Sequence, residues 1–335
     1  MTDAEVAIIG AGPIGIELAL SLKQKHVRYL HFEARQIGRT ISNWPRFTRF
    51  LSSPDEIAIP GIPLHSPPQD RPTGEDYLAY LRTVVQHYDL PIRTFEPITN
   101  IKPLEGGRFE LTSAPPGLPE QTHRVRRVVL AVGDMHRPAR LEVPGADLPH
   151  VRHAYTDPHY YFGRKVLVVG GGNSAVEASQ RLFRVGATVT LSSRGENVKQ
   201  MSSHKIGPEV QVLIKKGLIE FLSRTAVVNI TPEFAELAAV DESPEVADGP
   251  RTRVRCDAVL ALIGYRADLT LFRQAGVEIN PSGDPVLDRD TMETNVPGVY
   301  VVGTAAAGDM PGHTVFIETG HPHVTRVTEA LLTSL

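Results

Sequence analysis

Residues 6–15 read VAIIGAGPIG and residues 166–175 read VLVVGGGNSA, and these two stretches decide the fold. Each starts as a short apolar run, passes through closely spaced glycines, and continues with the residue spacing of an amphipathic helix. A second predicted strand follows each helix, at residues 27–33 and 188–192. Two strand–helix–strand units of this kind predict parallel sheets with helices packed on their faces, and therefore an α/β protein.

The first stretch has the spacing GxGxxG at Gly10, Gly12 and Gly15. These glycines allow a tight turn, close approach of a pyrophosphate to the backbone, and close packing of helix against strand. Glu33 ends the next predicted strand, about 20 residues further on, where an acidic residue binds the ribose hydroxyls. Because a carboxylate repels a 2′-phosphate, we predict an unphosphorylated adenosine at this motif, as in FAD or NAD.

The second stretch has the related spacing GxGxxA at Gly170, Gly172 and Ala175, but its next strand ends in Ser192-Ser193-Arg194. Hydroxyls and a guanidinium suit a 2′-phosphate, because Arg presents a planar fork of donors. Lys199 is a candidate second cation. The motif favours NADPH over NADH, with a simple surface charge as the alternative role of Arg194. Two nucleotides in one chain indicate hydride transfer from NADPH to a flavin.

Length and composition limit the remaining possibilities. The chain has 335 residues, 35 Lys+Arg against 38 Asp+Glu, and one Cys. We expect about two domains. The balanced charge gives no electrostatic footprint for nucleic acid, and no apolar run reaches the ~18 residues of a membrane span. With no targeting segment in view, we expect a cytoplasmic protein. One Cys excludes an internal disulfide and any mechanism with two thiols from one chain.

Four stretches together resemble the flavoproteins with two dinucleotide-binding domains, in the layout of low-molecular-weight thioredoxin reductases. They are residues 10–33, 129–133 (VLAVG), 170–177 (GGGNSAVE) and 296–303 (VPGVYVVG). The resemblance implies an α/β fold with two Rossmann-like domains of the three-layer ββα-sandwich type, the NADPH domain being inserted into a split FAD domain. We place the FAD domain at residues 1–140 and 267–335 and the NADPH domain at 141–266. Relatives of this kind also suggest a homo-oligomer.

Three further segments are similar to one subgroup, the bacillithiol-disulfide (bacilliredoxin) reductases. They are residues 43–44 (NW), 261–265 (ALIGY) and 316–323 (FIETGHPH). This subgroup has a Cys after the Pro of the first glycine motif, where this chain has Ile14. Thioredoxin reductases have a Cys-x-x-Cys instead, and residues 134–169 contain no Cys. A disulfide substrate would therefore have to meet the flavin directly or bring its own thiols.

The motifs and the resemblance give two sets of candidate cofactor residues. The candidates for FAD are Gly10, Gly12, Pro13, Ile14, Gly15, Glu33, Ala34, Trp44, Ala131, Gly133, Gly303, Thr304, His313 and Thr314. The candidates for NADPH are Gly170, Gly172, Asn173, Ser174, Ala175, Glu177, Ser193, Arg194, Lys199 and Gly264.

Several single residues keep two interpretations. Thr304 stands where the family has an Asp for the ribityl chain. Trp44 either stacks near the flavin or packs in the core, and His313 either lines the flavin pocket or lies in a surface loop. His321 and His323 lack the carboxylate or Cys partners of a metal site, so we expect no metal. The lone Cys256 beside an apolar run is expected to be a packed, inert thiol.

The predicted function is that of an NADPH-dependent, FAD-containing oxidoreductase of the pyridine nucleotide-disulfide reductase class. The first candidate acceptor is a low-molecular-weight, bacillithiol-type disulfide or the disulfide of a small redox protein. The alternatives are a ferredoxin–NADP reductase of thioredoxin-reductase type and a non-catalytic FAD/NADPH redox sensor. Monooxygenation is disfavoured, because residues 145–153 do not match the signature F-x-G-x-x-x-H. No side chain is assigned as a catalytic residue.

Overall fold

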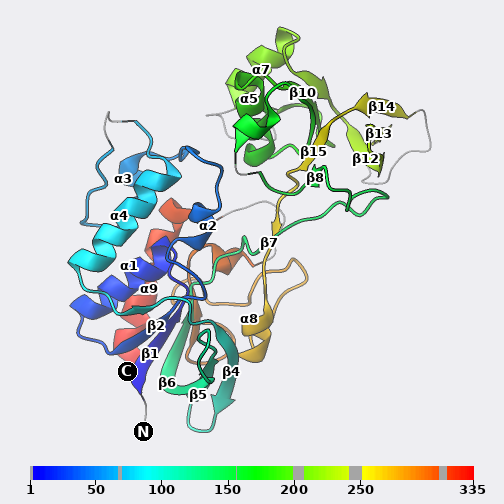
Figure 1. Cartoon of the computed structure of the whole chain (residues 1–335). Coiled ribbons are helices and arrows are strands. Elements are labelled where there is room, and N and C mark those ends of the chain that lie inside the picture. Colours follow the sequence, from blue (N-terminus) through cyan, green and yellow to red (C-terminus); the bar gives the residue numbers. More distant parts are fainter. Residues whose placement is uncertain (1–2, 67–69, 156, 199–206, 241–250, 309–314) are drawn as a thin grey trace. The chain divides into compact units, whose positions relative to one another are not determined.

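The computed structural model describes residues 3–66, 70–155, 157–198, 207–240, 251–308 and 315–335. The chain divides into two compact units (Figure 1). Unit 1 consists of Met1–His136 and Arg266–Leu335, and unit 2 is Arg137–Tyr265. The two segments that join them pair as short strands, β7 (Arg137–Pro138) and β16 (Tyr265–Arg266).

Unit 1 is built on a seven-stranded sheet of order β3-β2-β1-β6-β5-β4, with β17 on β6. Its strands are β1 (Ala4–Ile9), β2 (Tyr29–Phe32), β3 (Ile92–Arg93), β4 (Ile98–Leu104), β5 (Arg108–Ser113), β6 (Gln121–Leu130) and β17 (Val299–Val301). The long strand β6 pairs with β5 in antiparallel fashion near its start, and with β1 and β17 in parallel near its end. The sequence of residues 98–132, which ends in the apolar run 128–132 (VVLAV), predicts short antiparallel strands. The structure confirms them.

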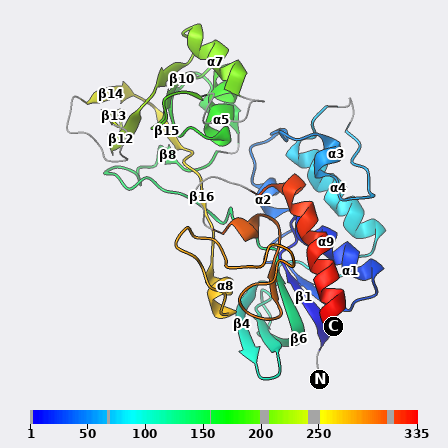
Figure 2. The same ribbon diagram turned by 180° about the vertical axis from the view of Figure 1, so that it is seen from behind.

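The helices of unit 1 pack on this sheet around a buried apolar core. They are α1 (Pro13–Gln24), α2 (Arg39–Ser42), α3 (Pro54–Ile57), α4 (Gly74–His87), α8 (Thr270–Gln274), the 3₁₀ turn η2 (Gly303–Ala307) and α9 (Ile317–Ser334). Helices α1 and α9 lie side by side, as Figure 2 shows, although their sequences are far apart. The oxygens of Ser21 and Thr328 are 2.9 Å apart across this contact.

Two local details bear on the predicted elements. Thr73, with Asp76 three residues on, predicts the N-cap of a helix, and the Thr73 hydroxyl does accept a hydrogen bond from the Asp76 amide (3.1 Å) at the start of α4. The six prolines of residues 53–72 predict an ordered loop without regular structure, but this segment contains α3. Ser53 at the N-cap and Pro54 at the first helical position favour this short turn.

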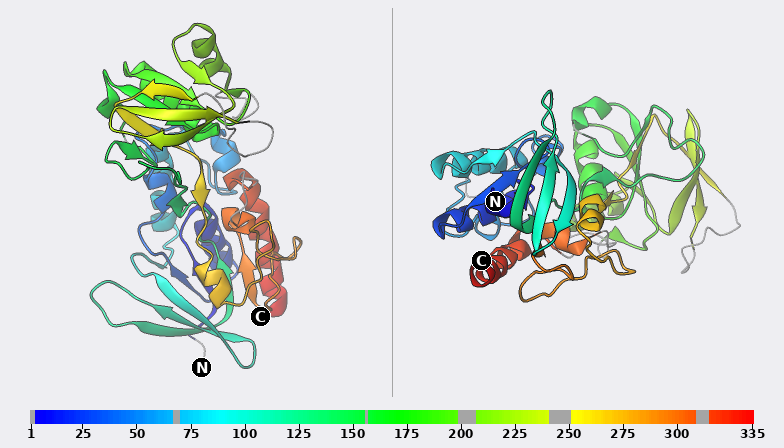
Figure 3. Two further views of the ribbon diagram at one scale, coloured as in Figure 1. Left: turned by 90° about the vertical axis from the view of Figure 1, so that its right-hand side faces the viewer. Right: turned by 90° about the horizontal axis from the view of Figure 1, so that it is seen from below.

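Unit 2 has three layers, seen in Figure 3. Its central parallel sheet has the order β11-β10-β9-β15-β8. The strands are β8 (Val151–Arg152), β9 (Lys165–Val169), β10 (Thr188–Ser192), β11 (Glu220–Leu222) and β15 (Ala258–Ala261). An antiparallel sheet of β12 (Thr225–Ile230), β13 (Phe234–Ala239) and β14 (Thr252–Arg255) packs on it across an apolar core. The helical elements are η1 (Pro158–Tyr161), α5 (Asn173–Arg184) and α7 (Gly207–Lys215).

Both units contain a strand, a glycine turn, a helix and a second parallel strand in sequence, β1-α1-β2 and β9-α5-β10. The predicted α/β fold with two Rossmann-like domains is confirmed. Among the described helices, none combines the length and apolar character needed to cross a bilayer.

Candidate cofactor-binding sites

The first glycine loop, residues 10–15, lies between the end of β1 and the start of α1. A Cβ built at Gly10 would lie 2.4 Å from the Ala131 carbonyl oxygen, and one at Gly15 would lie 2.1 Å from that of Gly10. These two glycines are therefore required by packing. Gly12 is different, because a Cβ there would meet no atom within 4 Å.

Gly12 is the N-cap of α1, and its helix start has no side-chain cap. The first amides of a helix lack internal partners and carry the positive end of its dipole, which attracts phosphate. Pro13 at the first helical position removes one donor that would otherwise need a partner. The open face at Gly12 thus fits a pyrophosphate on an uncapped helix N-terminus.

Glu33 lies directly after β2 and is 9% exposed. Its Oε2 accepts a hydrogen bond from the Ala11 amide (2.7 Å), and its Oε1 accepts one from the Arg35 amide (2.8 Å). Each carboxylate oxygen has a second acceptor position, so a ribose hydroxyl can still bind. Ala34, the next residue, is exposed. The carboxylate both braces the glycine loop and presents an acceptor beside it.

A buried histidine supports the same loop from β2. The Nε2 of His31 donates to the Gly10 carbonyl oxygen (2.9 Å). Burial lowers the pKa of His31 to about 4, so the ring is neutral near pH 7. The sequence analysis did not single out His31, whose contact with Gly10 depends on the register of β2 against β1.

The remaining FAD candidates of the described chain converge on the start of α1. A Cβ at Gly133, just after β6, would lie 3.6 Å from the Thr304 Oγ1. Gly303 and Gly320 both border Ile14: a Cβ at Gly303 would be 3.2 Å from its Cβ, and one at Gly320 would be 2.9 Å from its Cδ1. Ile14 therefore fills the space between α1, η2 and the start of α9.

Histidines on α9 fix that helix next to the loop. His321 Nδ1 and Glu17 Oε2 are 2.6 Å apart. The hydrogen bond to Glu17 raises the pKa of His321, and burial raises the pKa of Glu17. His323 Nδ1 accepts from the Gly303 amide (3.2 Å), and burial lowers its pKa to about 4. The Glu17–His321 contact joins residues 304 positions apart, and the Gly303–His323 contact joins residues 20 positions apart. The sequence analysis predicted neither contact.

Trp44 packs on a core residue, which agrees with one of the two interpretations of this side chain. Its ring packs on Phe50 with a centroid distance of 4.7 Å, and the side chain is half-buried. The candidates His313 and Thr314 lie outside the described residues, as does Lys199 of the second site.

The second glycine loop, residues 170–175, repeats the geometry of the first. A Cβ at Gly170 would lie 2.3 Å from the Leu262 carbonyl oxygen, whereas one at Gly172 would meet no atom within 4 Å. Gly172 is the N-cap of α5 and has no side-chain cap. Ala175 is fully buried, where the first loop has its third glycine. This uncapped helix start also fits a pyrophosphate.

The other residues proposed for this site differ in their contacts. Asn173 is the first residue of α5, Ser174 is exposed, and the Glu177 carboxylate lies 3.5 Å from the Arg181 guanidinium one turn later. Gly264 accepts a hydrogen bond from the Ala139 amide (2.9 Å) in the segment that joins the units. Of these, Asn173 and Ser174 lie nearest the open helix start.

Ser193 is the structural counterpart of Glu33. The Gly170 amide donates to the Ser192 carbonyl as the Gly10 amide does to that of Phe32. The next residue in each chain segment accepts from the amide two positions later. Glu33 accepts from the Arg35 amide, and Ser193 Oγ accepts from the Gly195 amide (3.1 Å). Arg194 follows and is exposed. The second site therefore offers a guanidinium where the first offers a carboxylate.

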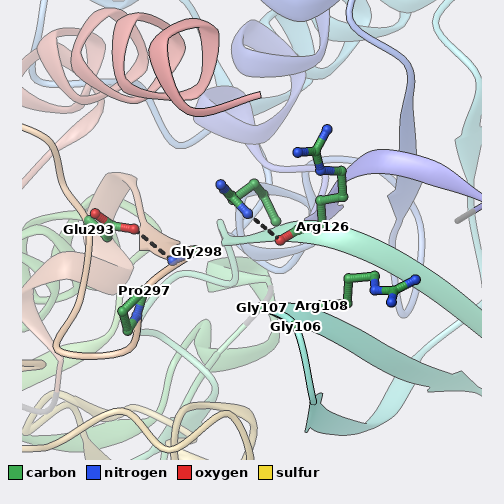
Figure 4. Close-up of a pocket in the computed structure, with 8 residues that line it drawn as sticks. Gly106, Gly107, Arg108, Arg126, Glu293, Pro297 and Gly298 are labelled. Atoms are coloured by element: carbon green, nitrogen blue, oxygen red, sulfur yellow. Dashed lines mark hydrogen bonds between the residues drawn. The ribbon is translucent and has the colours of Figure 1, made fainter.

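A pocket of about 580 Å³ lies in unit 1 among residues that neither glycine loop uses (Figure 4). Two of its arginines are occupied by the end of α9: Arg126 donates to the Leu335 carbonyl (3.0 Å) and Arg127 to that of Ser334 (2.8 Å). Glu293 accepts from the Gly298 amide across the pocket (2.6 Å). The described residues contain no group of three or more His, Cys, Asp or Glu placed to hold a metal ion.

Comparison with known proteins assigns the class. The sequence profile of the pyridine nucleotide-disulphide oxidoreductase family matches residues 7–303, and the chain belongs to this family. It is an oxidoreductase, and membership implies FAD and NADPH as its cofactors, which agrees with the two predicted from the glycine motifs.

Individual relatives agree with the subgroup that the sequence resembles. A bacilliredoxin reductase, Bdr, of Bacillus subtilis (strain 168) is 31% identical over 324 residues, 96% of either chain. The solved bacillithiol disulfide reductase Bdr (YpdA) from Bacillus cereus is 28% identical with a TM-score of 0.91, over 99% of both chains. A ferredoxin–NADP reductase of Ignicoccus hospitalis is 26% identical over 96% of this chain and 99% of its own. The predicted resemblance is confirmed.

Proposed function

We propose that the protein takes a hydride from NADPH through FAD and reduces a small disulfide or the disulfide of a small redox protein. The observation that supports this most is the contrast between two similar glycine loops. One is followed by a buried carboxylate, Glu33, and the other by a hydroxyl and an exposed guanidinium, Ser193 and Arg194. The first suits the free ribose of FAD, and the second suits the 2′-phosphate that distinguishes NADPH from NADH.

Each cofactor would be held by the residues of one unit. When bound, NADPH supplies a hydride and FAD passes the electrons on. In unit 1, amides at the start of α1 would bind the pyrophosphate, Glu33 would accept from the ribose, and the Thr304 hydroxyl would donate to the ribityl chain. The same set includes Gly10, Gly12, Pro13, Ile14, Gly15, Ala34, Trp44, Ala131, Gly133, Gly303, His313 and Thr314. Residues 1–140 and 267–335 would thus form the FAD domain.

In unit 2, the start of α5 would bind the NADPH pyrophosphate and Arg194 the 2′-phosphate. The same set includes Gly170, Gly172, Asn173, Ser174, Ala175, Glu177, Ser193, Lys199 and Gly264. Residues 141–266 would form the NADPH domain. We further propose that the protein forms a homo-oligomer, which is what the family resemblance implies.

The acceptor must bring its own redox sulfurs. Cys256 is the only Cys of the chain, it is 2% exposed, and burial raises its pKa to about 11. A protonated, enclosed thiol is a poor nucleophile. Ile14 fills the place at the start of α1 where the subgroup has a Cys. A disulfide substrate would therefore accept electrons at the flavin without a protein thiol as intermediate.

A ferredoxin–NADP reductase is the second candidate, because a relative with that name aligns over 96% of the chain and such an activity needs no protein thiol. Anaerobic stopped-flow reduction of the bound flavin by NADPH and by NADH tests the cofactor part. Steady-state NADPH oxidation with bacillithiol disulfide, an oxidised bacilliredoxin or ferredoxin then tests the acceptor. Turnover with ferredoxin alone would overturn the disulfide assignment, and fast flavin reduction with no turnover would favour a redox sensor.

Cys256→Ala is the control for the thiol argument. It should retain the turnover number of the unmodified protein within about twofold, because the thiol is enclosed and protonated. A loss of tenfold or more, with the flavin still bound, would contradict a mechanism without a protein thiol.

A further inference from the structure

The edge of the unit 2 sheet places a second arginine next to Arg194. Strand β11 is the neighbour of β10 and runs parallel to it, with Ser192 opposite Leu222 as the last pair. The regular register ends there, and the turns that follow the two strands contain Arg194 and Arg224. Neighbouring strands are only about 4.8 Å apart, so both arginines leave the sheet at the same carboxyl edge.

Backbone hydrogen bonds hold the two turns together beyond the last strand pair. The Ser193 amide donates to the Leu222 carbonyl (3.0 Å), and the Thr225 amide donates to the Ser193 carbonyl (2.9 Å). The Arg224 amide in turn donates to the Gly195 carbonyl (3.2 Å). The backbone of Arg224 is thus fixed against the turn that contains Arg194.

Arg224 occupies an unfavourable backbone conformation there. Its φ is +49°, in the left-handed region that Gly adopts freely. For a residue with a Cβ this costs on the order of 1 kcal/mol. Arg224 thus places a long cationic side chain at a position where the backbone favours Gly.

Within the described part of the chain, the Arg224 guanidinium pairs with a carboxylate from the turn that contains Arg194. Its Nη2 lies 3.3 Å from Glu196 Oε2, and the two side chains are 52% and 64% exposed. Exposed ion pairs of this kind contribute little, roughly 0–1 kcal/mol. A phosphate group could therefore displace Glu196, because it carries up to two negative charges and three acceptor oxygens, whereas a carboxylate carries one charge and two oxygens.

We infer that Arg224 is the second guanidinium of the 2′-phosphate site and helps to select NADPH over NADH. It would supply a second guanidinium from the turn after the neighbouring strand, because the segment Ser192-Ser193-Arg194 has only one. Glu196 holds Arg224 when no phosphate is present and competes with the phosphate when it binds. This inference rests on the proposed use of NADPH.

The test measures binding rather than turnover. Titration calorimetry of the FAD-loaded protein compares adenosine 2′,5′-bisphosphate with 5′-AMP, which differs only by the 2′-phosphate. Arg224→Gln should weaken binding of the bisphosphate roughly tenfold, as expected for one charge-assisted contact. Binding of 5′-AMP should stay within about twofold, because the lost contact is to the 2′-phosphate alone. Glu196→Gln should strengthen binding of the bisphosphate a few-fold, a gain that misfolding cannot produce.

Arg251→Gln is the matched control, because Arg251 is also an exposed, ion-paired arginine of unit 2 (58% exposed, 3.7 Å from Glu236). Arg251→Gln should change neither the affinity for adenosine 2′,5′-bisphosphate nor the affinity for 5′-AMP. Should Arg194→Gln remove the preference for the bisphosphate while Arg224→Gln leaves it intact, the role of Arg224 is refuted and the proposed function stands. Equal affinity of the unmodified protein for both nucleotides would instead refute NADPH selection itself.

Discussion

The two glycine loops have almost the same backbone: the N-cap Gly12 has φ −75° and ψ −177°, and Gly172 has φ −74° and ψ 178°. In both loops, a Cβ built at the first glycine would overlap a carbonyl oxygen just after the adjacent strand, at 2.4 Å for Gly10 and 2.3 Å for Gly170. The side chains that follow differ completely. The comparison teaches that the pyrophosphate site comes from the backbone, whereas the choice of nucleotide comes from a few side chains after the second strand.

The side chains also tie the two loops into their units to different extents. Glu33 reaches back to the Ala11 amide and His31 bonds the Gly10 carbonyl, whereas their counterparts are Ser193 and Leu191. Ile14 is buried under α9, but its counterpart Ser174 is exposed. A loop braced from three sides suits a resident cofactor such as FAD, and an open one suits a nucleotide that must bind and leave.

The largest effect is expected from adding a methyl group to the first glycine of either loop. Gly10→Ala and Gly170→Ala should each lower the free energy of unfolding by more than about 3 kcal/mol, because the Cβ would overlap a carbonyl oxygen and the backbone φ is positive. Urea unfolding, or failure to obtain folded protein, reports the effect.

Gly12→Ala separates folding from binding in the first loop. With open space around the new Cβ, the free energy of unfolding of flavin-free protein should fall by no more than about 1 kcal/mol, the typical cost of Ala at a helix N-cap. FAD affinity should nevertheless fall, because the methyl group occupies the face proposed for the pyrophosphate. Unchanged FAD binding in this variant would contradict the placement of the cofactor.

A smaller effect is expected at the end of β2. Glu33→Ala removes the acceptor of two backbone amides and of the ribose hydroxyls. Unsatisfied buried donors cost about 1–3 kcal/mol, so FAD affinity should fall roughly 10- to 100-fold. The fluorescence of FAD released from the protein measures this loss of affinity. Ser193→Ala, at the corresponding position of unit 2, should leave FAD affinity within about twofold, since Ser193 accepts from the Gly195 amide within unit 2. An equal loss of FAD affinity there would remove the distinction between the loops.

What the sequence predicted well were features determined by local chemistry. The glycines at 10, 12 and 15, the cap at Thr73 and the antiparallel strands before residue 132 follow from spacing and residue type alone. The contact of His31 with the Gly10 carbonyl depends on the register of β2 against β1. The contact of Arg224 with the turn that contains Arg194 depends on backbone hydrogen bonds beyond the ends of β10 and β11. The Glu17–His321 pair joins opposite ends of the chain. No periodicity or motif encodes such contacts, so only the structure reveals them.

The pH dependence of stability should also separate the two loops. Burial holds the folded-state pKa of His31 at about 4 against 6.5 when unfolded, so its contribution is complete above pH 6.5 and is lost as pH falls from 6.5 towards 4. Between pH 7.5 and 5.5 this amounts to about 1.4 kcal/mol, one pKa unit of linkage.

His31→Gln removes this titration and keeps a donor for the Gly10 carbonyl, so urea unfolding should show a shallower loss of stability on acidification. Other histidines remain in the variant, including His323, whose pKa is also lowered to about 4; the difference between the two proteins is therefore the quantity to compare. His87→Gln, on the exposed face of α4, should leave the pH profile unchanged. Parallel profiles for the protein and His31→Gln would show that His31 does not couple protonation to the first loop.

The smallest effect concerns the second residue of α1 and of α5, which are Ile14 and Ser174. Ile14→Val should lower the free energy of unfolding by about 1 kcal/mol, the usual cost of a buried methyl group. Ser174→Ala, at an exposed position, should change it by no more than about 0.5 kcal/mol.

The contact between Ile14 and Gly320 allows a sharper test. A Cβ at Gly320 would lie 2.9 Å from the Ile14 Cδ1, the atom that Ile14→Val removes. Gly320→Ala should therefore be more destabilising alone than in the Ile14→Val background, with a coupling of at least about 0.5 kcal/mol in a double-mutant cycle. Additive effects would mean that Ile14 does not fill the space between α1 and α9, and the thiol position of the subgroup would then be open in this chain.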